Sequence, residues 1–494
     1  IIKASNGVNV VNIAAPNSGG VSRNNFSDYN VNRSGLVINN SSVRRYGNGT
    51  VNTELGGVIM TNDNLVNSGG ANVILNQVTS NRISRINGFT EIAGRSADLI
   101  ITNPNGIIVN GGGFINTDRL GMVVGSEISG SEAGISDGSS IVGGDGGDLY
   151  FRLTSAPHLE SGFLPALTIS SDGIDLTRVN RSEFAANLIR ITGGVYADDN
   201  DLHFLAGDNV YDRSGNVTSS LPNGNVGVDD GSGGGDGGDV DSGGGSPPKQ
   251  IAIDVSSLSQ IQAGNIFMVA SKEGFGVKYS GEMIANLGVI DVSSAGDIEF
   301  KDFATSSNSF VASSDGGDIN FSDSRVVSDE GITLASNKGV SVNNSEVASG
   351  GETAIIGNSI LVANSSKLFA RGLIGMSSGG DLDIDSSNIT ALNLNVDASD
   401  ILIENNSTVD VNEEGVLNSD GDIKINLSDL FLSDAVFNAK NVYIANNSNL
   451  TVSNIDFNIT GDVGNDSKVS IDKSSKILSV RNDDDNVGDA ENDI

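Results

Sequence analysis

Few side chains in this sequence could carry out nucleophilic or metal-based chemistry. Among its 494 residues there is no Cys and there are only two His, which excludes thiol nucleophiles, Cys-ligated zinc and disulfide scaffolds. A Ser–His–Asp triad could use only His158 or His203. The second lies near Asp198, Asp199 and Asp201, but a single surface His beside Asp residues is typical of a solvated group. We therefore predict no catalytic, metal-binding or cofactor-binding residues.

Calcium is the one ion for which the sequence offers candidate ligands. Residues 143–150 (GGDGGDLY) and 233–240 (GGGDGGDV) each resemble one copy of a calcium-binding nonapeptide. Such repeats bind calcium in tandem, because each ion requires about 6–8 oxygen ligands, and here each copy is isolated. Simple glycine turns are the favoured interpretation, and calcium binding stays an open alternative.

The charge balance excludes another class of function. The chain has 62 Asp+Glu against 28 Lys+Arg, a net charge of −34. A protein that binds nucleic-acid backbones needs a basic face, so we expect no nucleic-acid partner. Positive charge is concentrated in the first hundred residues, at Arg23, Arg33, Arg44, Arg45, Arg82, Arg85 and Arg95. These residues form either ion pairs along an exposed face or a contact patch for a protein partner.

The elements that must position these residues are short strands. Helical spacing of apolar residues is almost absent, and the best helix candidate is Arg181–Ile191. Elsewhere short apolar runs alternate with Asn, Asp, Gly and Ser, which favour turns. The clearest predicted strands are Val8–Ile13, Leu36–Ile38, Val73–Val78, Leu99–Ile101 and Ile107–Val109. No apolar run approaches the roughly 18–20 residues of a membrane span, so we expect no stable membrane insertion.

A repeat organises the C-terminal half of the sequence. Its unit is apolar–x–apolar–x–x–Ser–x–apolar, as in residues 340–347 (VSVNNSEV). The repeated serines, which lie 20 or 21 residues apart, are Ser324, Ser345, Ser366, Ser387, Ser407, Ser428 and Ser448. One unit is too short to bury a core, but stacked units bury a continuous one. The period predicts one coil of a parallel β-helix, with Asn and Ser at its corners and hydrogen-bonded side-chain ladders along the rod.

Other folds and activities share parts of this pattern. A β-sandwich would produce the regular spacing only by coincidence, and the Leu-x-x-Leu-x-Leu-x-x-Asn signature of leucine-rich repeats is absent. Parallel β-helices also include polysaccharide lyases, which use clustered Asp for calcium and a Lys or Arg as base. Basic residues between 298 and 480 are scattered and form no such constellation. We predict that the chain is not an enzyme, and the lyase is the alternative from a different functional class.

The N-terminal part of the sequence carries two asparagine motifs that resemble those of a known family. The motif residues are Asn103, Pro104, Asn105, Gly106 and Ile107 and, earlier in the chain, Asn62, Asp63, Asn64 and Leu65. They resemble the hallmark motifs of two-partner-secretion exoproteins, the filamentous-haemagglutinin-like family of Gram-negative bacteria, with Asp63 in place of a proline. Residues 188–211 and 251–281 resemble later blocks of the same secretion domain.

This resemblance implies a fold and a domain organisation. The implied fold is all-β, a right-handed parallel β-helix with an N-terminal cap and small extra-helical sheets, in agreement with the repeat. We expect the two-partner-secretion domain at residues 1–290, with a Gly/Asp-rich insertion at 222–250. Repeats of about 21 residues follow at 291–480, and an acidic disordered tail at 481–494.

The residue types of the second motif predict a rigid turn. Pro104 fixes φ and biases the residue before it towards extended backbone, while Asn105 and Gly106 favour turns. We expect this turn to connect two strands. It serves either as a corner that stabilises the cap or as a surface that the transporter recognises directly.

The resemblance also implies a function and partners. We expect a secreted or surface-displayed exoprotein, exported by an outer-membrane β-barrel transporter whose periplasmic domains recognise the N-terminal domain. Its downstream role would be adhesion, through a receptor on a host or neighbouring cell. Alternatives within the family are the stalk of a contact-dependent inhibition toxin and a haemolysin. We expect a monomer whose signal peptide has been removed, since no charged segment followed by an apolar run opens the chain.

Overall fold

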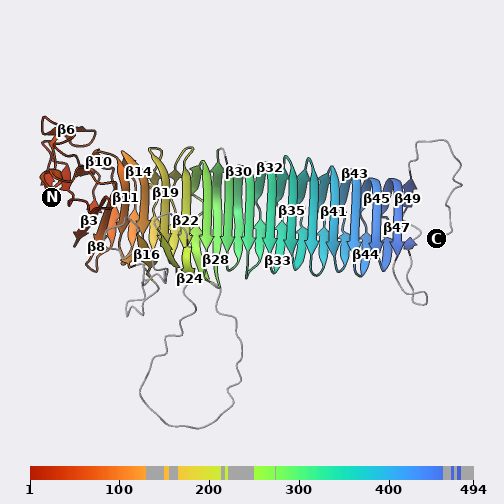
Figure 1. Ribbon diagram of the computed structural model, residues 1–494. Helices are drawn as coiled ribbons and strands as arrows, with labels where there is room; N and C mark the ends of the chain where they lie inside the picture. The colour runs from red at the N-terminus through yellow and green to blue at the C-terminus, as the bar shows by residue number, and fades with distance from the viewer. Residues whose placement is uncertain are drawn as a thin grey trace, which may run out of the picture.

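The computed structural model of the chain is a rod of stacked β-strands with a cap at its N-terminal end (Figure 1). It describes residues 1–129, 149–154, 165–207, 209–212, 217–220, 250–272, 274–286, 288–459, 469–471 and 476–479. Within these ranges the helical structure is one 3₁₀ turn, η1 (Asp63–Leu65), and no helix is long and apolar enough to span a membrane. The features that lie wholly or mostly outside the described residues are His158, the segments 143–150 and 233–240, the insertion at 222–250 and the tail at 481–494.

A separate sheet forms the cap. Its strands are β1 (Ile2–Lys3), β2 (Asn9–Asn12), β5 (Leu36–Asn40), β10 (Thr90–Gly94) and β13 (Phe114–Ile115), in this spatial order. A hairpin of β6 (Thr50–Thr53) and β7 (Gly57–Met60) packs on one face through an apolar cluster. The other face joins the core of the rod, since Ile38 and Ile92 belong to the same buried cluster as the coils. The cap thus covers an end of the rod that would otherwise expose an open apolar core.

Less regular coils connect the cap to the rest of the rod. All five strands predicted from the sequence are confirmed, two of them in the cap and three in these coils. The strands of the less regular coils stack in parallel from coil to coil. These strands are β3 (Val21–Phe26), β4 (Asn30–Val31), β8 (Val73–Val78), β9 (Ser84–Ile86), β11 (Ala97–Thr102), β12 (Ile107–Val109), β14 (Thr117–Val123), β17 (Leu167–Ile169), β18 (Ile174–Asp175), β19 (Val179–Ala186), β20 (Ile189–Ile191), β21 (Val195–Tyr196), β22 (Asp201–Ala206), β25 (Gln250–Val255), β26 (Gln260–Ala263), β27 (Asn265–Ala270), β28 (Phe275–Ala285) and β29 (Val289–Ser294).

Regular coils form the remainder, and each contributes three strands. One coil contains β33 (Gly339–Asn343), β34 (Glu346–Ser349) and β35 (Glu352–Gly357), and each pairs in parallel with its counterpart in the next coil. The other strands here are β30 (Ile298–Ser314), β31 (Ile319–Ser322), β32 (Arg325–Ser336), β36 (Ser359–Ala363), β37 (Lys367–Ala370), β38 (Leu373–Ser378), β39 (Leu382–Asp385), β40 (Asn388–Ala391), β41 (Asn393–Ala398), β42 (Ile401–Glu404), β43 (Thr408–Ser419), β44 (Asp422–Asn426), β45 (Asp429–Ala439), β46 (Asn441–Ala445), β47 (Asn449–Ile459), β48 (Val469–Ile471) and β49 (Lys476–Ser479). The predicted parallel β-helix is confirmed.

The core runs along the inside of these coils. Residues alternate between inside and outside, so that Val340 and Val342 of β33 are buried while their neighbours are partly exposed. Equivalent side chains stack on each other: the rings of Phe300 and Phe321 lie 4.7 Å apart between centroids, which is one strand spacing. Burial of one such ring stabilises the fold by about 1.5–3 kcal/mol.

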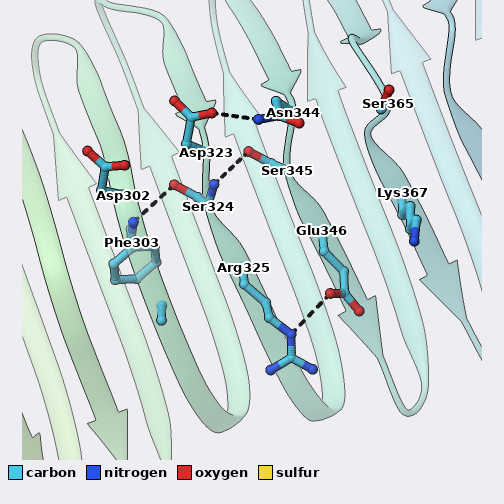
Figure 2. Close-up of a pocket in the computed structure, with 11 residues that line it drawn as sticks. Asp302, Phe303, Asp323, Ser324, Arg325, Asn344, Ser345, Glu346, Ser365 and Lys367 are labelled. Carbon is cyan, nitrogen blue, oxygen red and sulfur yellow. Dashed lines mark hydrogen bonds and ion pairs between the residues drawn. The ribbon is translucent and has the colours of Figure 1, made fainter.

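The repeated serines line one corner of the rod, and all seven are buried. Figure 2 shows the start of this corner, where the backbone N–H of Ser324 donates to the hydroxyl of Ser345 at 3.0 Å. The Ser345 hydroxyl in turn donates to the carbonyl of Asn343 at 2.7 Å. The residue before each repeated serine has a positive φ of 45–67°. The predicted ladders and corners are therefore confirmed.

A second sheet lies outside the helix, over the less regular coils. It is antiparallel and contains β15 (Gly125–Ile128), β16 (Tyr150–Leu153), β23 (Asn209–Asp212) and β24 (Val217–Ser220). Phe151 and Tyr211 of this sheet pack against outward-facing residues of the coils, including Ala185 and Leu205. The Arg23 side chain of β3 also pairs with Glu127 of β15 at 2.8 Å. This sheet corresponds to the extra-helical structure implied by the resemblance.

Arg181–Ile191, the best helix candidate in the sequence, is not helical, because these residues form β19 and β20. Phe184 points into the core, where its ring stacks on Phe204. Ala185 points outwards but is covered by the extra-helical sheet. Both faces of β19 are buried, so the alternation of apolar and polar residues that reveals a strand is lost.

Candidate functional site

The Asn103–Ile107 motif forms a tight turn between β11 and β12, as predicted. Asn103 is fully buried, and its Nδ2 donates to the carbonyl of Arg82 at 2.8 Å and to the hydroxyl of Ser84 at 2.9 Å. Its Oδ1 accepts the backbone N–H of Asn105 at 2.9 Å. The Asn105 side chain donates to the carbonyl of Ser80 at 2.7 Å. The motif is therefore hydrogen-bonded to the preceding coil at Ser80, Arg82 and Ser84.

Glycine is required at the end of this turn. Gly106 has a φ of 119°, which lies outside the range that side-chain-bearing residues normally adopt, and a Cβ there would meet the carbonyl of Ala166 at 3.2 Å. Ile107 then enters the core. Within this motif, Pro104 and the Asn105 side chain are the parts that remain partly exposed.

The earlier motif, Asn62–Leu65, repeats this geometry in the cap. Asn62 is fully buried, and its Nδ2 donates to the carbonyls of Ile13 and Asn39 at 2.9 and 3.0 Å. Its Oδ1 accepts the backbone N–H of Asn64 at 3.0 Å. Asp63, which stands where the family has proline, is exposed and opens η1, and Leu65 is buried. The turn thus forms without the proline, because the buried asparagine holds it.

A groove of about 310 Å³ lies beside the Asn103 turn, and we call it the arginine groove. Among its lining residues are Asp28, Asn30, Asn32, Arg82, Ile83 and Arg85. They come from two neighbouring corner segments, one around β4 and the other between β8 and β9. Sequence reasoning missed Ile83 as a surface residue, although an apolar residue beside Arg82 was a visible signal.

The arginines of the first hundred residues divide into two groups. Arg23, Arg33 and Arg82 form ion pairs with Glu127, Asp172 and Asp28, respectively, at 2.8–3.2 Å. Among the described residues Arg44, Arg45, Arg85 and Arg95 are exposed and form no ion pair. The ion-pair interpretation is confirmed for the first group, and the contact patch for a protein partner stays a prediction for the second.

His203 is half-buried and not the solvated group that the sequence indicated. Its ring stacks on that of Phe267 at 4.5 Å between centroids, and within the described residues its buried Nε2 has no hydrogen-bond partner. Burial and the positive charge of Arg181 lower the pKa of His203 to about 4. Arg181 itself pairs with the buried Glu183, which Arg119 also contacts. His203 is therefore neutral at pH 7.

A wider, shallow groove of about 590 Å³ runs along the serine corner of the rod (Figure 2). Its charged groups largely satisfy one another: Arg325 pairs with Glu346 at 3.0 Å, and Asp323 accepts from Asn344 at 2.6 Å. Across the described part of the chain, no group of three or more His, Cys, Asp or Glu is placed to hold a metal ion. This groove offers hydrogen bonds but no paired nucleophile and base.

Comparison with known proteins identifies the family. The family model described as the TPS secretion domain matches residues 1–300. The chain belongs to this family. The TPS secretion domain thus includes both asparagine motifs, the arginine groove and the extra-helical sheet.

Curated relatives share the same segment. A protein of Escherichia coli named Toxin CdiA is 32% identical over 314 residues, which cover 63% of this chain and 8% of that protein. The tRNA nuclease CdiA-2 of Burkholderia pseudomallei is 31% identical over 297 residues, 60% of this chain and 8% of that protein. The chain spans less than a tenth of the length of these relatives, so the activities in their names are not assigned to it.

Solved structures of secretion domains are also similar. The crystal structure of the filamentous hemagglutinin secretion domain matches with a TM-score of 0.48 and 25% identity, over 75% of this chain and 96% of that chain. The HMW1 secretion domain from Haemophilus influenzae matches with a TM-score of 0.31 and 12% identity, over 93% and 94% of the two chains.

Proposed function

We propose that this chain is the export domain and the first part of the stem of a secreted or cell-surface exoprotein. Residues 1–290 act as the domain that a dedicated outer-membrane β-barrel transporter recognises through its periplasmic domains. Residues 291–480 form a β-helical stem. The family match over residues 1–300 carries this proposal.

The architecture is suited to export of an unfolded chain. The cap closes one end of the rod, and each later coil pairs with the coil before it, so an emerging chain can add one coil at a time to a folded end. The absence of Cys means that no disulfide can lock the chain before it passes the pore. Folding outside the cell would then bias transport outwards.

Within this proposal the two asparagine motifs act mainly as structural corners, Asn62–Leu65 in the cap and Asn103–Ile107 in the coils beside it. The amides of Asn62 and Asn103 are buried and already bound to backbone and side-chain acceptors. A transporter would reach only their exposed neighbours, such as Asp63 and Asn64. The motifs would therefore support recognition by shaping the surface around them.

Secretion of the chain, fused to a signal peptide, from cells with and without the cognate transporter tests the proposal. We expect secretion only with the transporter, and loss of secretion for Asn103→Ala. Asn67→Ala, at an exposed position of the cap, is the matched control. Circular dichroism of the purified variants separates the two roles of the motif: loss of both fold and secretion indicates a corner, whereas loss of secretion alone indicates direct contact. Secretion without any transporter would contradict the proposal.

The role of the exported protein is a second question. We propose that the stem carries a distal part that acts either in adhesion or as a toxin. The names of the curated relatives, Toxin CdiA and tRNA nuclease CdiA-2, favour the toxin stalk as the second candidate. In the full gene, a long tandem continuation of the repeat would favour an adhesin, and a compact globular C-terminal domain would favour a toxin.

A further inference from the structure

We propose that the arginine groove is the surface on which the transporter docks, and that its occupant is an acidic segment of the transporter's periplasmic domains. This inference rests on the proposed function, which supplies the partner. The groove, and not the asparagine motif itself, would make the contacts. Three observations lead to it: the distribution of charge, the state of the groove side chains, and the way the motif holds them.

Charge is distributed very unevenly along the chain. Residues 1–110 contain 8 Lys+Arg and 5 Asp+Glu, whereas the remaining residues contain 20 Lys+Arg and 57 Asp+Glu. An acidic partner is therefore repelled by the body of the rod and attracted to its N-terminal end. Such complementarity directs encounters to one region and raises association rates.

The groove side chains are available for a partner. Arg85 is exposed and forms no ion pair within the described residues. Arg82 pairs with Asp28, but both side chains remain exposed, at 69% and 38%. Surface pairs of this kind contribute only about 0–1 kcal/mol, so Arg82 can exchange Asp28 for a carboxylate of the partner. Ile83, which is 36% exposed between these arginines, adds an apolar contact.

The asparagine motif fixes the backbone that carries these side chains. Asn103 binds the carbonyl of Arg82 and the hydroxyl of Ser84, the residues on either side of Ile83. Asn105 binds the carbonyl of Ser80 at the start of the same segment. The Ser80 hydroxyl donates to the carbonyl of Ser27, on the opposite side of the segment. A buried motif can thus control recognition without touching the partner.

Binding of the purified chain to the full-length cognate transporter in detergent tests this inference. We compare wild type, Arg82→Glu/Arg85→Glu in the groove, and Arg44→Glu/Arg45→Glu as a control with the same change of charge. Arg44 and Arg45 are exposed residues of the same N-terminal region and do not line the groove. We expect a loss of affinity of about tenfold or more for the groove variant, less than about threefold for the control, and weaker wild-type binding as salt is raised.

The outcomes separate this inference from the proposed function. If the groove variant binds the transporter as tightly as wild type, or if both double variants lose the same affinity, the groove is not the docking surface. The proposed export function is unaffected by either result. Absence of binding by wild type, together with secretion without the transporter, would overturn both. If thermal unfolding shows that the double variant does not fold, Arg85→Glu decides, because the side chain of Arg85 holds no ion pair in the described structure.

Discussion

Buried polar residues form the corners of both the cap and the regular coils, but they do so in different ways. In the cap, Asn62 connects the carbonyls of Ile13 and Asn39, residues that lie 49 and 23 positions earlier in the chain. In the regular coils, Ser366 binds the carbonyl of Ala363 in its own turn and that of Val342 in the preceding coil. Asn62 joins segments that are distant in the sequence, whereas the serine, like Asn103, joins a coil to its neighbour.

This difference predicts how strongly a substitution in each part of the molecule affects stability. A repeat array is stabilised by many similar contacts between neighbours, so one weakened corner affects mainly the adjacent coils. The asparagine corners, one in the cap and one in the coils beside it, are not part of such an array. Because later coils build on the cap, a defect there has the larger consequence.

The largest effect is expected from Asn103→Ala. The substitution leaves the carbonyl of Arg82, the hydroxyl of Ser84 and the N–H of Asn105 without their partner, at a buried site. We expect a loss of about 3 kcal/mol in the stability of the N-terminal coils, measured by hydrogen exchange of their amides. For the exposed Asn67→Ala we expect a change within about 0.5 kcal/mol. A loss below about 1 kcal/mol at Asn103 would remove the proposed contrast with the serine corners.

His203 makes the stability of the less regular coils depend on pH in the acid range. Its pKa is lowered to about 4 by burial and by Arg181, from an ordinary value of 6.5. The folded state resists protonation, so stability is full above pH 6.5 and falls as the pH drops from 6.5 towards 4. Allowing for partial exposure, we expect His203→Gln to abolish about 1–2 kcal/mol of acid destabilisation between pH 7 and pH 4. Urea midpoints of both proteins at the two pH values measure it, and parallel midpoints would contradict it.

A serine corner should be weaker and more local. We expect Ser366→Ala to cost about 1–2 kcal/mol, because it removes a buried hydroxyl that donates to the carbonyls of Val342 and Ala363 and accepts the N–H of Ser345. Ser377→Ala, at an exposed position one strand further on, is the control and should be neutral. Faster hydrogen exchange should be confined to the adjacent coils. Spreading of the effect to the cap would show that the corners are coupled over long distances.

The sequence predicted the regular coils better than the cap for a physical reason. In the repeat, the short stretches of alternating apolar residues recur at the same spacing as the serines. Either feature alone would predict the parallel β-helix. In the less regular coils an additional sheet covers Ala185 on the outer surface, so Arg181–Ile191 lacks strand alternation and its apolar residues match helical spacing instead. Local pattern cannot reveal a covering layer formed by distant residues.

The candidate site was predictable only in part. The turn at Pro104 followed from residue preferences, but the partners of the buried asparagines did not, since they lie 19 to 49 residues away along the chain. The burial of His203 was likewise hidden, because Phe267 reaches it from the next coil. The serine corners, by contrast, were predicted, because Asn and Ser recur there at regular spacing and both favour turns.

Asp383 provides the counterpart of His203 in the regular coils. It lies on the outer face of β39 between Leu361 and Leu402, and burial together with Glu404 and Asp385 raises its pKa to about 6. The loss of folding stability caused by its negative charge is fully present above pH 6. It disappears below pH 3.8, the ordinary pKa of an Asp side chain. After discounting for exposure, we expect Asp383→Asn to gain about 1 kcal/mol at pH 8 and nothing at pH 3.5.

The control for this change is Asp397→Asn, at an exposed position. It should leave the urea midpoint unchanged at both pH values. A gain of equal size in both variants would mean that general relief of negative charge, in a chain of net charge −34, is responsible.

The smallest effect concerns a corner that departs from its neighbours. Leu427 precedes Ser428 with a φ of +51°, where equivalent positions hold Asn, Asp or Ser, and its side chain is 39% exposed. A leucine is strained in this conformation, whereas asparagine tolerates it. We expect Leu427→Asn to raise stability by about 0.5–1 kcal/mol, measured by urea denaturation, and Leu361→Asn, at an exposed strand position, to give no gain. If Leu427→Asn is neutral, the buried serine alone sets the corner, and the regular coils resemble the cap in depending on one polar residue at each turn.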